Sequence, residues 1–468
     1  MSIRVYNTIT RKKEAFHPIE TGKVRMYTCG PTVYDYAHIG NYRTFIFEDL
    51  LRRYLEYRGF AVTHAMNLTD VDDNTIRRSR ERNISLQALT DEFKTAFHAD
   101  LKTLNIQPAH HYPEATNYVD AMIQMVSHLE AKGYAYKAED GSVYFNIEKY
   151  NQYGKLAHLN PEEMMRGGRV ADDSYEKEGV RDFALWKGYK SEDGDVHWES
   201  PWGPGRPGWH IECSVMSTEL LGPHFDIHCG GVDNIFPHHE NELAQSVCAT
   251  GSEFVNYWMH SEYLLVDNKK MSKSLNNFYT LRDLLDQGYP AEAIRWMLIT
   301  THYRQKLNFS VSRLEEAQKA VNRLREFYSK LQAYEGAGEE HAHDKIQAVE
   351  TNFIEAMDDD LNISGGLAAI FDLVRWGNKA LVEAKLSTVG VTALIDLLHR
   401  FDHVLGVLEM ESGLQVEIDA DFIEAKIAAR KEARANKDFA TSDAIRDELA
   451  AQGIELIDTP EGTHWKLK

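Results

Sequence analysis

A strand, a glycine-containing loop, a helix and a second strand follow one another near the amino terminus, and this order constrains the fold most. Residues 24–30 (VRMYTCG) have the composition of a short buried strand, and residues 61–70 (AVTHAMNLTD) suggest another. Between them, residues 44–58 have the spacing of an amphipathic helix, and Gly59 suits the position just after its end. This order begins an α/β domain, so we predict a parallel sheet.

The middle of the chain predicts an insertion into that sheet. Residues 134–147 (YAYKAEDGSVYFNI) alternate around Asp140-Gly141, which is typical of a β-hairpin. The Pro- and Gly-rich residues 201–210 mark the return to the parallel domain. Residues 224–231 (HFDIHCGG) then predict a strand, and residues 237–251 predict a helix with Pro237 near its first turn and Gly251 after its end.

Helical periodicity dominates from about residue 290. Residues 290–302, 311–335 and 363–385 have the pattern of long amphipathic helices, which predicts a helical bundle, although a polar linker at 335–343 interrupts it. A small module at 420–468 begins with a basic helix, and four cations follow one stripe along it: Lys426, Arg430, Arg434 and Lys437. Such a stripe is either a solvated helix face or a surface that follows the phosphates of a structured RNA.

Charge and composition exclude several classes of protein. The 468 residues carry a net charge of −20, which argues against loose coating of RNA or DNA but leaves a specific RNA partner open. No apolar run approaches the ~18 residues of a membrane span, and the amino terminus lacks the apolar core of a secretory signal. The four cysteines are too sparse for a disulfide scaffold. We therefore expect a cytoplasmic protein with buried or metal-binding thiols.

Two short segments indicate nucleotide chemistry. Residues 38–41 (HIGN) precede the first predicted helix, where backbone N–H groups attract phosphate; Gly40 allows close approach, and His38 and Asn41 can donate hydrogen bonds. Residues 270–274 (KMSKS) hold Lys270 and Lys273, which can clamp a triphosphate as pyrophosphate leaves. Taken singly, the segments are equally an ordinary loop and a solvated lysine run. Together and in this order they predict an enzyme that uses ATP to activate a carboxylate.

Four dispersed side chains have the chemistry of a zinc site. His238 and Glu242 are four residues apart on a predicted helix and share a face. Together with Cys29 and Cys213 they offer two thiolates, an imidazole and a carboxylate, which suit tetrahedral Zn²⁺. Spacing does not choose between His238 and His239, because a residue three positions from Glu242 also faces it.

Six ordered segments resemble the cysteinyl-tRNA synthetases, which are class I aminoacyl-tRNA synthetases. They are residues 29–41 (CGPTVYDYAHIGN), 67–73 (NLTDVDD), 205–216 (GRPGWHIECSVM), 236–242 (FPHHENE), 256–260 (NYWMH) and 270–274 (KMSKS). The resemblance extends to residues 460–466 (PEGTHWK) and covers effectively the whole chain.

The resemblance implies a Rossmann-type parallel-sheet catalytic domain with an insertion, followed by a helical bundle and a small anticodon-binding module. The expected parts are a first catalytic half at 1–118, an inserted connective domain at 119–204, a second catalytic half at 205–264, a stem region with the KMSKS loop at 265–309, a helical bundle at 310–412 and an anticodon-binding module at 420–468.

The resemblance also implies roles for single residues. One Zn²⁺ per chain would bind Cys29, Cys213, His238 and Glu242, which selects His238 by analogy alone. The amino-acid pocket would comprise Thr69, Trp209, His228 and Asp233, with Asp233 available for the substrate ammonium. ATP, accompanied by Mg²⁺, would contact His38, Gly40, Asn41 and Lys273, with Lys270 as a second catalytic lysine. Anticodon contacts would fall on Arg434, Asp443 and Asp458.

The implied reaction has two steps. The carboxylate of L-cysteine attacks the α-phosphate of ATP to give cysteinyl-adenylate and pyrophosphate, and the 3′-terminal adenosine of tRNA-Cys then accepts the cysteinyl group. Positioning and charge stabilisation supply the rate. Zinc would select the substrate thiolate over a serine hydroxyl, so no editing domain is expected. We expect a monomer with no DNA or membrane partner.

Four positions depart from the family pattern. Asn41 stands where His is common, Cys229 where Gly is frequent, Val232 in place of a small polar residue, and Asn276 in place of Gly. Cys229 lies near the proposed pocket in sequence and is a candidate to perturb metal loading or to oxidise.

Three other interpretations compete with a synthetase. A cysteine ligase of thiol-cofactor (mycothiol-type) synthesis uses the same activation but lacks a terminal RNA-reading module such as residues 420–468. A non-catalytic tRNA-binding paralogue would have no need for the KMSKS segment, His38 or the zinc ligands. A zinc hydrolase built on residues 238–242 would leave the HIGN and KMSKS segments unexplained.

Overall fold

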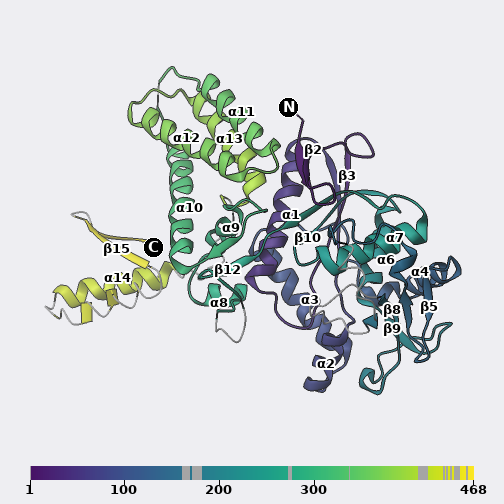
Figure 1. Ribbon diagram of the computed structural model, residues 1–468. Coiled ribbons are helices and arrows are strands. Elements are labelled where there is room, and N and C mark those ends of the chain that lie inside the picture. The colour runs from purple at the N-terminus through teal and green to yellow at the C-terminus, as the bar shows by residue number, and fades with distance from the viewer. Residues whose placement is uncertain are drawn as a thin grey trace. The chain divides into compact units, whose positions relative to one another are not determined.

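The computed structural model forms two compact units, Met1–Glu411 and Ser412–Lys468, which are considered separately (Figure 1). The described residues are 2–160, 169–170, 182–271, 277–336, 338–408, 410, 420–435, 438, 441–442, 445–446, 449, 454–459 and 462–467.

The first unit is built on a four-stranded parallel sheet. Its strands are β3 (Lys23–Thr28), β4 (Ala61–Met66), β10 (Phe225–Gly231) and β11 (Val255–Ser261), in the order β11-β10-β3-β4. The chain runs from β3 to β4 on one side and later from β10 to β11 on the other, so the strand order reverses between β3 and β10. Ligands of such sheets bind beyond the carboxyl ends of the strands at this reversal. The predicted α/β class is confirmed.

Helix α1 (Ile39–Tyr57) starts earlier than the apolar periodicity predicted. His38 Nδ1 accepts a hydrogen bond from the backbone N–H of Asn41 (3.2 Å), and Asn41 Oδ1 accepts one from the backbone N–H of His38 (3.0 Å). This reciprocal capping box satisfies two N–H groups at the helix start. The helix ends as predicted, with Gly59 at φ +87°.

The predicted hairpin lies between β5 (Ala135–Lys137) and β6 (Val143–Phe145), which pair antiparallel, with Gly141 at φ +83°. Their sheet has the order β5-β6-β8-β7, and β9 pairs with β8. The other strands are β7 (Arg169–Val170), β8 (Asp182–Gly188) and β9 (Gly205–Pro207). This sheet is antiparallel except for the parallel pairing of β7 with β8, and it interrupts the parallel sheet in sequence, as predicted.

Further elements surround the two sheets. The hairpin of β1 (Arg4–Asn7) and β2 (Lys12–Ala15) packs beside β11, where the backbone N–H of Thr8 donates to the carbonyl of Trp258 at 2.9 Å. The helices are α2 (Asp73–Arg82), α3 (Leu86–Thr103), α4 (Val119–Ala131), α6 (Trp209–Leu221) and α7 (Glu240–Thr250). No helix within the described ranges is long and apolar enough to cross a bilayer.

The last part of the first unit is a small sheet followed by the bundle. The sheet has the order β13-β12-β14 and comprises β12 (Leu264–Val266), β13 (Lys269–Lys270) and β14 (Leu307–Phe309). The helices are α8 (Leu281–Asp286), α9 (Ala291–Ile299), α10 (Val311–Gln332), α11 (His343–Asp358), α12 (Ile363–Val382) and α13 (Thr388–Leu405). The predicted bundle is therefore present, as Figure 1 shows for α10 to α13.

A buried ion pair joins α1 to the stem helix α9. Arg295 is fully buried, and its guanidinium lies 2.6 Å from the carboxylate of Asp49. The same carboxylate accepts a hydrogen bond from Arg53 at 2.8 Å, while Arg295 also donates to the carbonyl of Leu405 at the end of α13. Sheet, stem and bundle therefore share one core.

The second unit holds α14 (Ala420–Ala435) and the antiparallel pair β15 (Ile454–Thr459) and β16 (Gly462–Leu467). The basic helix is present and Arg434 is exposed, but Arg430 is 5% exposed, so the predicted stripe is not solvated along its whole length. Asp458 lies in β15, whereas Lys437 and Asp443 lie outside the described residues.

Candidate functional site: a buried Cys, His and Glu cluster

The ends of β3 and β10 bring together a buried cluster of possible metal ligands. Cys29 follows β3 directly, Cys213 lies in α6, and Glu242 lies in the first turn of α7. His238 precedes α7 in a wide helical turn, Ile235–His239, and Pro237 lies in that turn, close to the first turn of α7 as predicted. The ligand atoms of these four predicted residues lie within 4.8 Å of one another, and all four side chains are buried.

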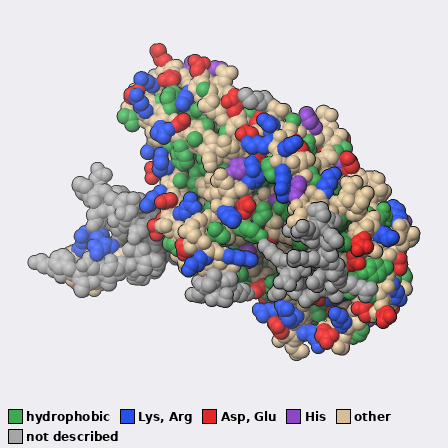
Figure 2. Space-filling view, in the orientation of Figure 1, with side chains coloured by type: hydrophobic (Ala, Val, Ile, Leu, Met, Phe, Trp, Pro, Cys, Tyr) green, Lys and Arg blue, Asp and Glu red, His purple; other side chains and the backbone are tan. Residues whose placement is uncertain are grey.

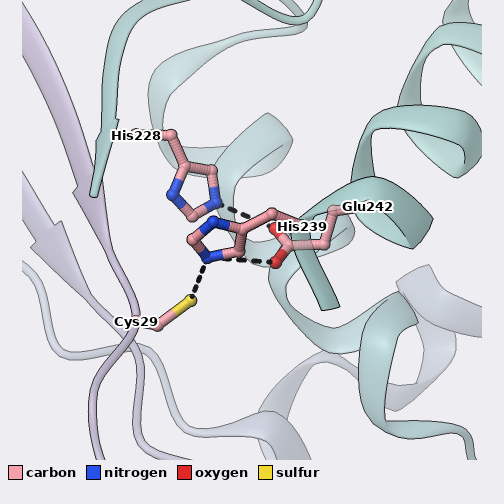
Figure 3. A group of neighbouring side chains, drawn as sticks. All are labelled: Cys29, His228, His239 and Glu242. Atoms are coloured by element: carbon pink, nitrogen blue, oxygen red, sulfur yellow. Dashed lines mark hydrogen bonds and ion pairs between the residues drawn. The ribbon is translucent and has the colours of Figure 1, made fainter. Parts of the chain in front are cut away.

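A second set of four ligands shares Cys29 and Glu242 with the first. Figure 3 shows this set, in which His228 and His239 replace Cys213 and His238, again with ligand atoms within 4.8 Å of one another. His239 Nε2 lies 3.2 Å from Cys29 Sγ, and His228 Nε2 lies 2.9 Å from Glu242 Oε2. Both His238 and His239 therefore lie close enough to bind a metal ion together with Cys29 and Glu242.

The imidazoles of His238 and His239 are each held by a further histidine through their Nδ1 atoms. His238 Nδ1 lies 2.8 Å from His210 Nδ1, and His239 Nδ1 lies 2.8 Å from His260 Nε2. Burial lowers the pKa of His238, His210 and His260 to about 3, so these rings are neutral near pH 7. A neutral imidazole with one nitrogen anchored is the form that binds a metal ion.

The thiols and the carboxylate complete a donor set that fits zinc. Burial raises the pKa of Cys29 well above its ordinary value, as does a hydrogen bond with Cys213, and burial raises that of Cys213 as well. Glu242 Oε1 is buried and accepts no well-directed hydrogen bond from the described residues, although His238 Nε2 lies 3.0 Å away. A bound divalent cation would offset the cost of burying the thiolates and the cost of burying the carboxylate, because it deprotonates a coordinating thiol and pairs with the carboxylate. Sulfur, nitrogen and oxygen donors in this number suit Zn²⁺.

Three of the four predicted pocket residues, Thr69, Trp209 and His228, contact the cluster or a residue beside it. The Trp209 ring stacks on His238 at 4.3 Å between centroids, and Thr69 Oγ1 donates to Glu212 Oε2 at 2.9 Å. Asp233 is exposed two residues after the end of β10, and its Oδ1 lies 2.3 Å from the place a Cβ on Gly231 would take.

Sequence reasoning did not single out Glu212, His210 or His260 as partners of the site. Glu212 and His210 are buried beside Trp209 and Cys213 on α6. The adjacency of a histidine and a glutamate to two predicted site residues in one helix was the available signal. For His260, the segment NYWMH offered no such signal, because its partner His239 comes from a different element.

The HIGN segment lies against Met271, Phe278 and Tyr279, which flank residues 272–276. The His38 ring packs edge-on against Phe278 (5.3 Å), and the backbone N–H of Ile39 donates to the carbonyl of Tyr279 (3.0 Å). A Cβ on Gly40 would lie 3.2 Å from the terminal methyl of Met271, so glycine allows the contact. Lys270 is exposed in β13, while Lys273 and Asn276 lie outside the described residues.

The departures from the family pattern have distinct settings. Asn41 uses its amide oxygen in the helix cap, and its Nδ2 donates to no described residue, so the amide can still meet a phosphate oxygen. Cys229 is fully buried in the core that contains α1, whereas Cys29 and Cys213 pack in the core on the other side of the sheet. Neighbouring residues of a strand point to opposite faces, which separates the Cys229 thiol from the cluster that its neighbour His228 joins.

Similarity to known proteins identifies the family. Residues 15–319 match the family model of the class I (C) tRNA synthetase catalytic domain, and residues 352–409 match that of the DALR domain. The cysteine–tRNA ligase of Protochlamydia amoebophila is 49% identical over 99% of this chain and 98% of that relative. The chain belongs to the cysteine–tRNA ligase family. The enzymes of Symbiobacterium thermophilum (48%, 100% of both chains) and Brachyspira hyodysenteriae (46%, 99% of both) carry the same name.

Solved structures agree on the fold alone. A methionyl-tRNA synthetase of Mycobacterium tuberculosis in complex with methionyl-adenylate is 15% identical, with a TM-score of 0.60 over 83% of this chain and 90% of that one. A leucyl enzyme of Agrobacterium radiobacter K84 in a ternary complex is 12% identical, with a TM-score of 0.59 over 86% of both chains. In this chain, the DALR match lies in the bundle helices α11 to α13 and not in the module at 420–468.

Proposed function

We propose that this chain ligates L-cysteine to tRNA-Cys at the expense of ATP, as a monomer in the cytoplasm. The buried cluster of two thiols, imidazoles and a carboxylate beside the paired HIGN and KMSKS loops carries the proposal. The cluster supplies a reason for choosing cysteine, and the loops supply a place for the triphosphate with its Mg²⁺. The family match over the full chain supports the same activity.

The first part of the mechanism is selection of the substrate. Cys29, Cys213, His238 and Glu242 would hold one Zn²⁺, and the bound ion would provide a site that prefers a thiolate to a hydroxyl. Thr69, Trp209 and His228 line the surroundings of that cluster, and Asp233 is available to the substrate ammonium. A site that requires one polar partner discriminates by ~10⁴ or more against an analogue without it.

The second part is activation of the carboxylate. His38, Gly40 and Asn41 at the start of α1 would receive the phosphates of ATP, where the positive end of the helix dipole favours anions. Lys270 and Lys273 would stabilise the negative charge that develops as pyrophosphate departs. Met271, which follows Lys270, lies against Gly40 of the HIGN loop, and this contact supports a ligand shared by the two segments.

The module at 420–468 is proposed to read the anticodon, through Arg434, Asp443 and Asp458. The presence of a basic helix and the exposure of Arg434 support this assignment. The domain limits given above for residues 1–412 are proposals of the same kind.

ATP–pyrophosphate exchange tests the proposal. Zinc-loaded protein is expected to exchange with cysteine and at least ~10⁴-fold less well with serine. No exchange with cysteine would contradict the whole proposal. Transfer of ¹⁴C-cysteine to tRNA-Cys, compared with transfer to an amino-sugar acceptor, separates it from the thiol-cofactor ligase. Sedimentation at micromolar protein tests the monomer.

A further inference from the structure

A separate cavity opens at the carboxyl end of β11, next to the site. Its volume is ≈ 260 Å³, and its walls come from the β1–β2 hairpin, the insertion, the β10–α7 connection and the segment after α9. Its lining includes Arg11, Leu156, Val232, Ile235, Glu262 and Arg304. Val232 directly precedes Asp233 of the proposed cysteine pocket, so the cavity and that pocket are neighbours.

The floor of the cavity connects to the metal cluster. His260 is 4% exposed, and its two nitrogens lie 2.7 Å from Thr8 Oγ1 and 2.8 Å from His239 Nδ1. His239 in turn lies 3.2 Å from Cys29 Sγ. Both nitrogens of His260 therefore have hydrogen-bond partners within the protein. The ring lines the cavity, and hydrogen bonds to a ligand must come from residues at the cavity's rim.

The rim carries two arginines and one carboxylate, that of Glu262, and one wall is apolar. Arg11 is exposed and pairs with no acid among the described residues, whereas Arg304 lies over the Tyr6 ring at 4.3 Å and is held by Asp360 at 2.6 Å. Leu156, Val232 and Ile235 form the apolar side. Figure 2 shows Lys and Arg side chains gathered over the region of the β1–β2 hairpin, to which Arg11 belongs.

This combination matches a nucleotide of a single strand. Such nucleotides bind proteins through a cation on the phosphate and flat contact of the base with apolar or aromatic side chains. The volume of ≈ 260 Å³ lies below the about 300 Å³ at which pockets for small molecules begin, so the cavity can take one base, with its phosphate at the rim, and not an extended strand. Cysteine and ATP occupy the reversal between β3 and β10 in the proposed function, so the remaining substrate, RNA, must enter from a neighbouring opening.

We propose that this cavity binds a nucleotide just before the 3′ end of the acceptor RNA, with its phosphate at Arg11 and its base against Leu156, Val232 and Ile235. The inference rests on the proposed function. It assigns to Arg11 and the cavity a role in the transfer step and none in the activation of cysteine.

Two variants test the cavity with zinc-loaded, full-length protein. Arg11→Glu reverses the charge at the rim, and Ala157→Trp fills the cavity from the insertion side, where Ala157 is a partly exposed lining residue. Both are expected to raise the KM for tRNA-Cys roughly tenfold, while exchange with cysteine stays within about twofold. Arg11→Ala should also reduce the slope of log KM against log salt by about 0.7, the value for one phosphate contact of a single strand. Lys23→Glu is the matched control, because Lys23 is an exposed cation at the opposite, amino end of β3.

Three outcomes would overturn the inference. The first is an unchanged KM for tRNA-Cys in both variants. The second is an equal fall in exchange and transfer, which would place the cavity in the activation step or in the stability of the fold. The third is that cytidine 5′-monophosphate changes the exchange rate of the wild type without competing with tRNA-Cys, which would make the cavity an effector site. Absence of exchange in the wild type would instead contradict the proposed function itself.

Discussion

His238 and Glu242 face each other across one turn, with 3.0 Å between Nε2 and Oε1. His239 Nε2 lies 3.9 Å from the same oxygen, so the carboxylate is reached by both imidazoles. Glu242 is thus common to both possible ligand sets, and a metal ion bound by either set must use it together with Cys29.

Zinc content should distinguish the Cys213 thiol, which belongs to the cluster, from the Cys229 thiol on the other side of the sheet. Cys213→Ser is expected to lose most of the bound zinc, because a hydroxyl is a poor replacement for a thiolate ligand. Cys229→Ala is expected to keep it, because that thiol packs in the core on the other side of the sheet. Metal analysis after gel filtration measures both.

The same measurement chooses between the ligand sets. If His238 is the ligand, His238→Gln should release more zinc than His239→Gln. Full zinc retention in Cys213→Ser, with loss in His228→Gln, would show that the set drawn in Figure 3 is the true one.

Asn41 links the stability of α1 to ATP binding. Asn41→Ala removes the capping oxygen and should lower the free energy of unfolding by about 1 kcal/mol. Asn41→Asp keeps the oxygen and should retain most of that stability, yet its charge would repel phosphate and raise the KM for ATP. Thermal melts and exchange kinetics separate these effects. If Asn41→Asp binds ATP as well as the wild type, the side chain is a cap alone.

The central sheet and the helices were readable from sequence because their signals are local. The strand at 24–30, the hairpin at 134–147 and the bundle each depend on period and turn residues within a short window. The start of α1 was not readable, because its first turn is fixed by hydrogen bonds between His38 and Asn41 and carries no apolar repeat.

The site was predictable only in part, for a physical reason. Cys29 and Glu242 come from segments that meet because the sheet order reverses, and no local period reports that meeting. Residue chemistry and resemblance together gave the four proposed ligands, but the contacts of His210 with His238 and of His260 with His239 join separate elements and follow from no local pattern.

The buried ion pair between Arg295 and Asp49 is expected to be essential for the first unit. Arg295→Met would leave the Asp49 carboxylate in the core with only Arg53 as its charged partner, at a cost of roughly 3–5 kcal/mol. Arg375→Met is the matched control: Arg375 is 70% exposed beside Asp372 on α12, so its loss should cost less than about 1 kcal/mol. Urea midpoints compare the two. Equal midpoints would show that the buried pair adds no stability beyond an exposed one.

Protonation of His64 is expected to lower the free energy of unfolding as the pH falls. It is buried on β4, 3.0 Å from Thr28 Oγ1, and burial followed by the nearby charge of Arg52 lowers its pKa to about 3. The unfolded chain takes up this proton near pH 6.5 and the folded chain does not, so the contribution is complete above about pH 6.5 and is lost as pH falls towards 3. The free energy of unfolding should decline by up to about 1.4 kcal/mol per pH unit below 6.5 from this group alone.

A His64→Gln variant isolates that contribution from those of the other buried histidines. Glutamine does not titrate, so the variant should lose less stability than the wild type between pH 7 and pH 5.5, whatever its stability at pH 7. Urea unfolding of both proteins at several pH values, with zinc removed from both by chelation, gives the difference in slope. Parallel slopes would mean that His64 takes up its proton in the folded state as readily as in the unfolded chain, and that its ring is more open to water than its burial on β4 implies.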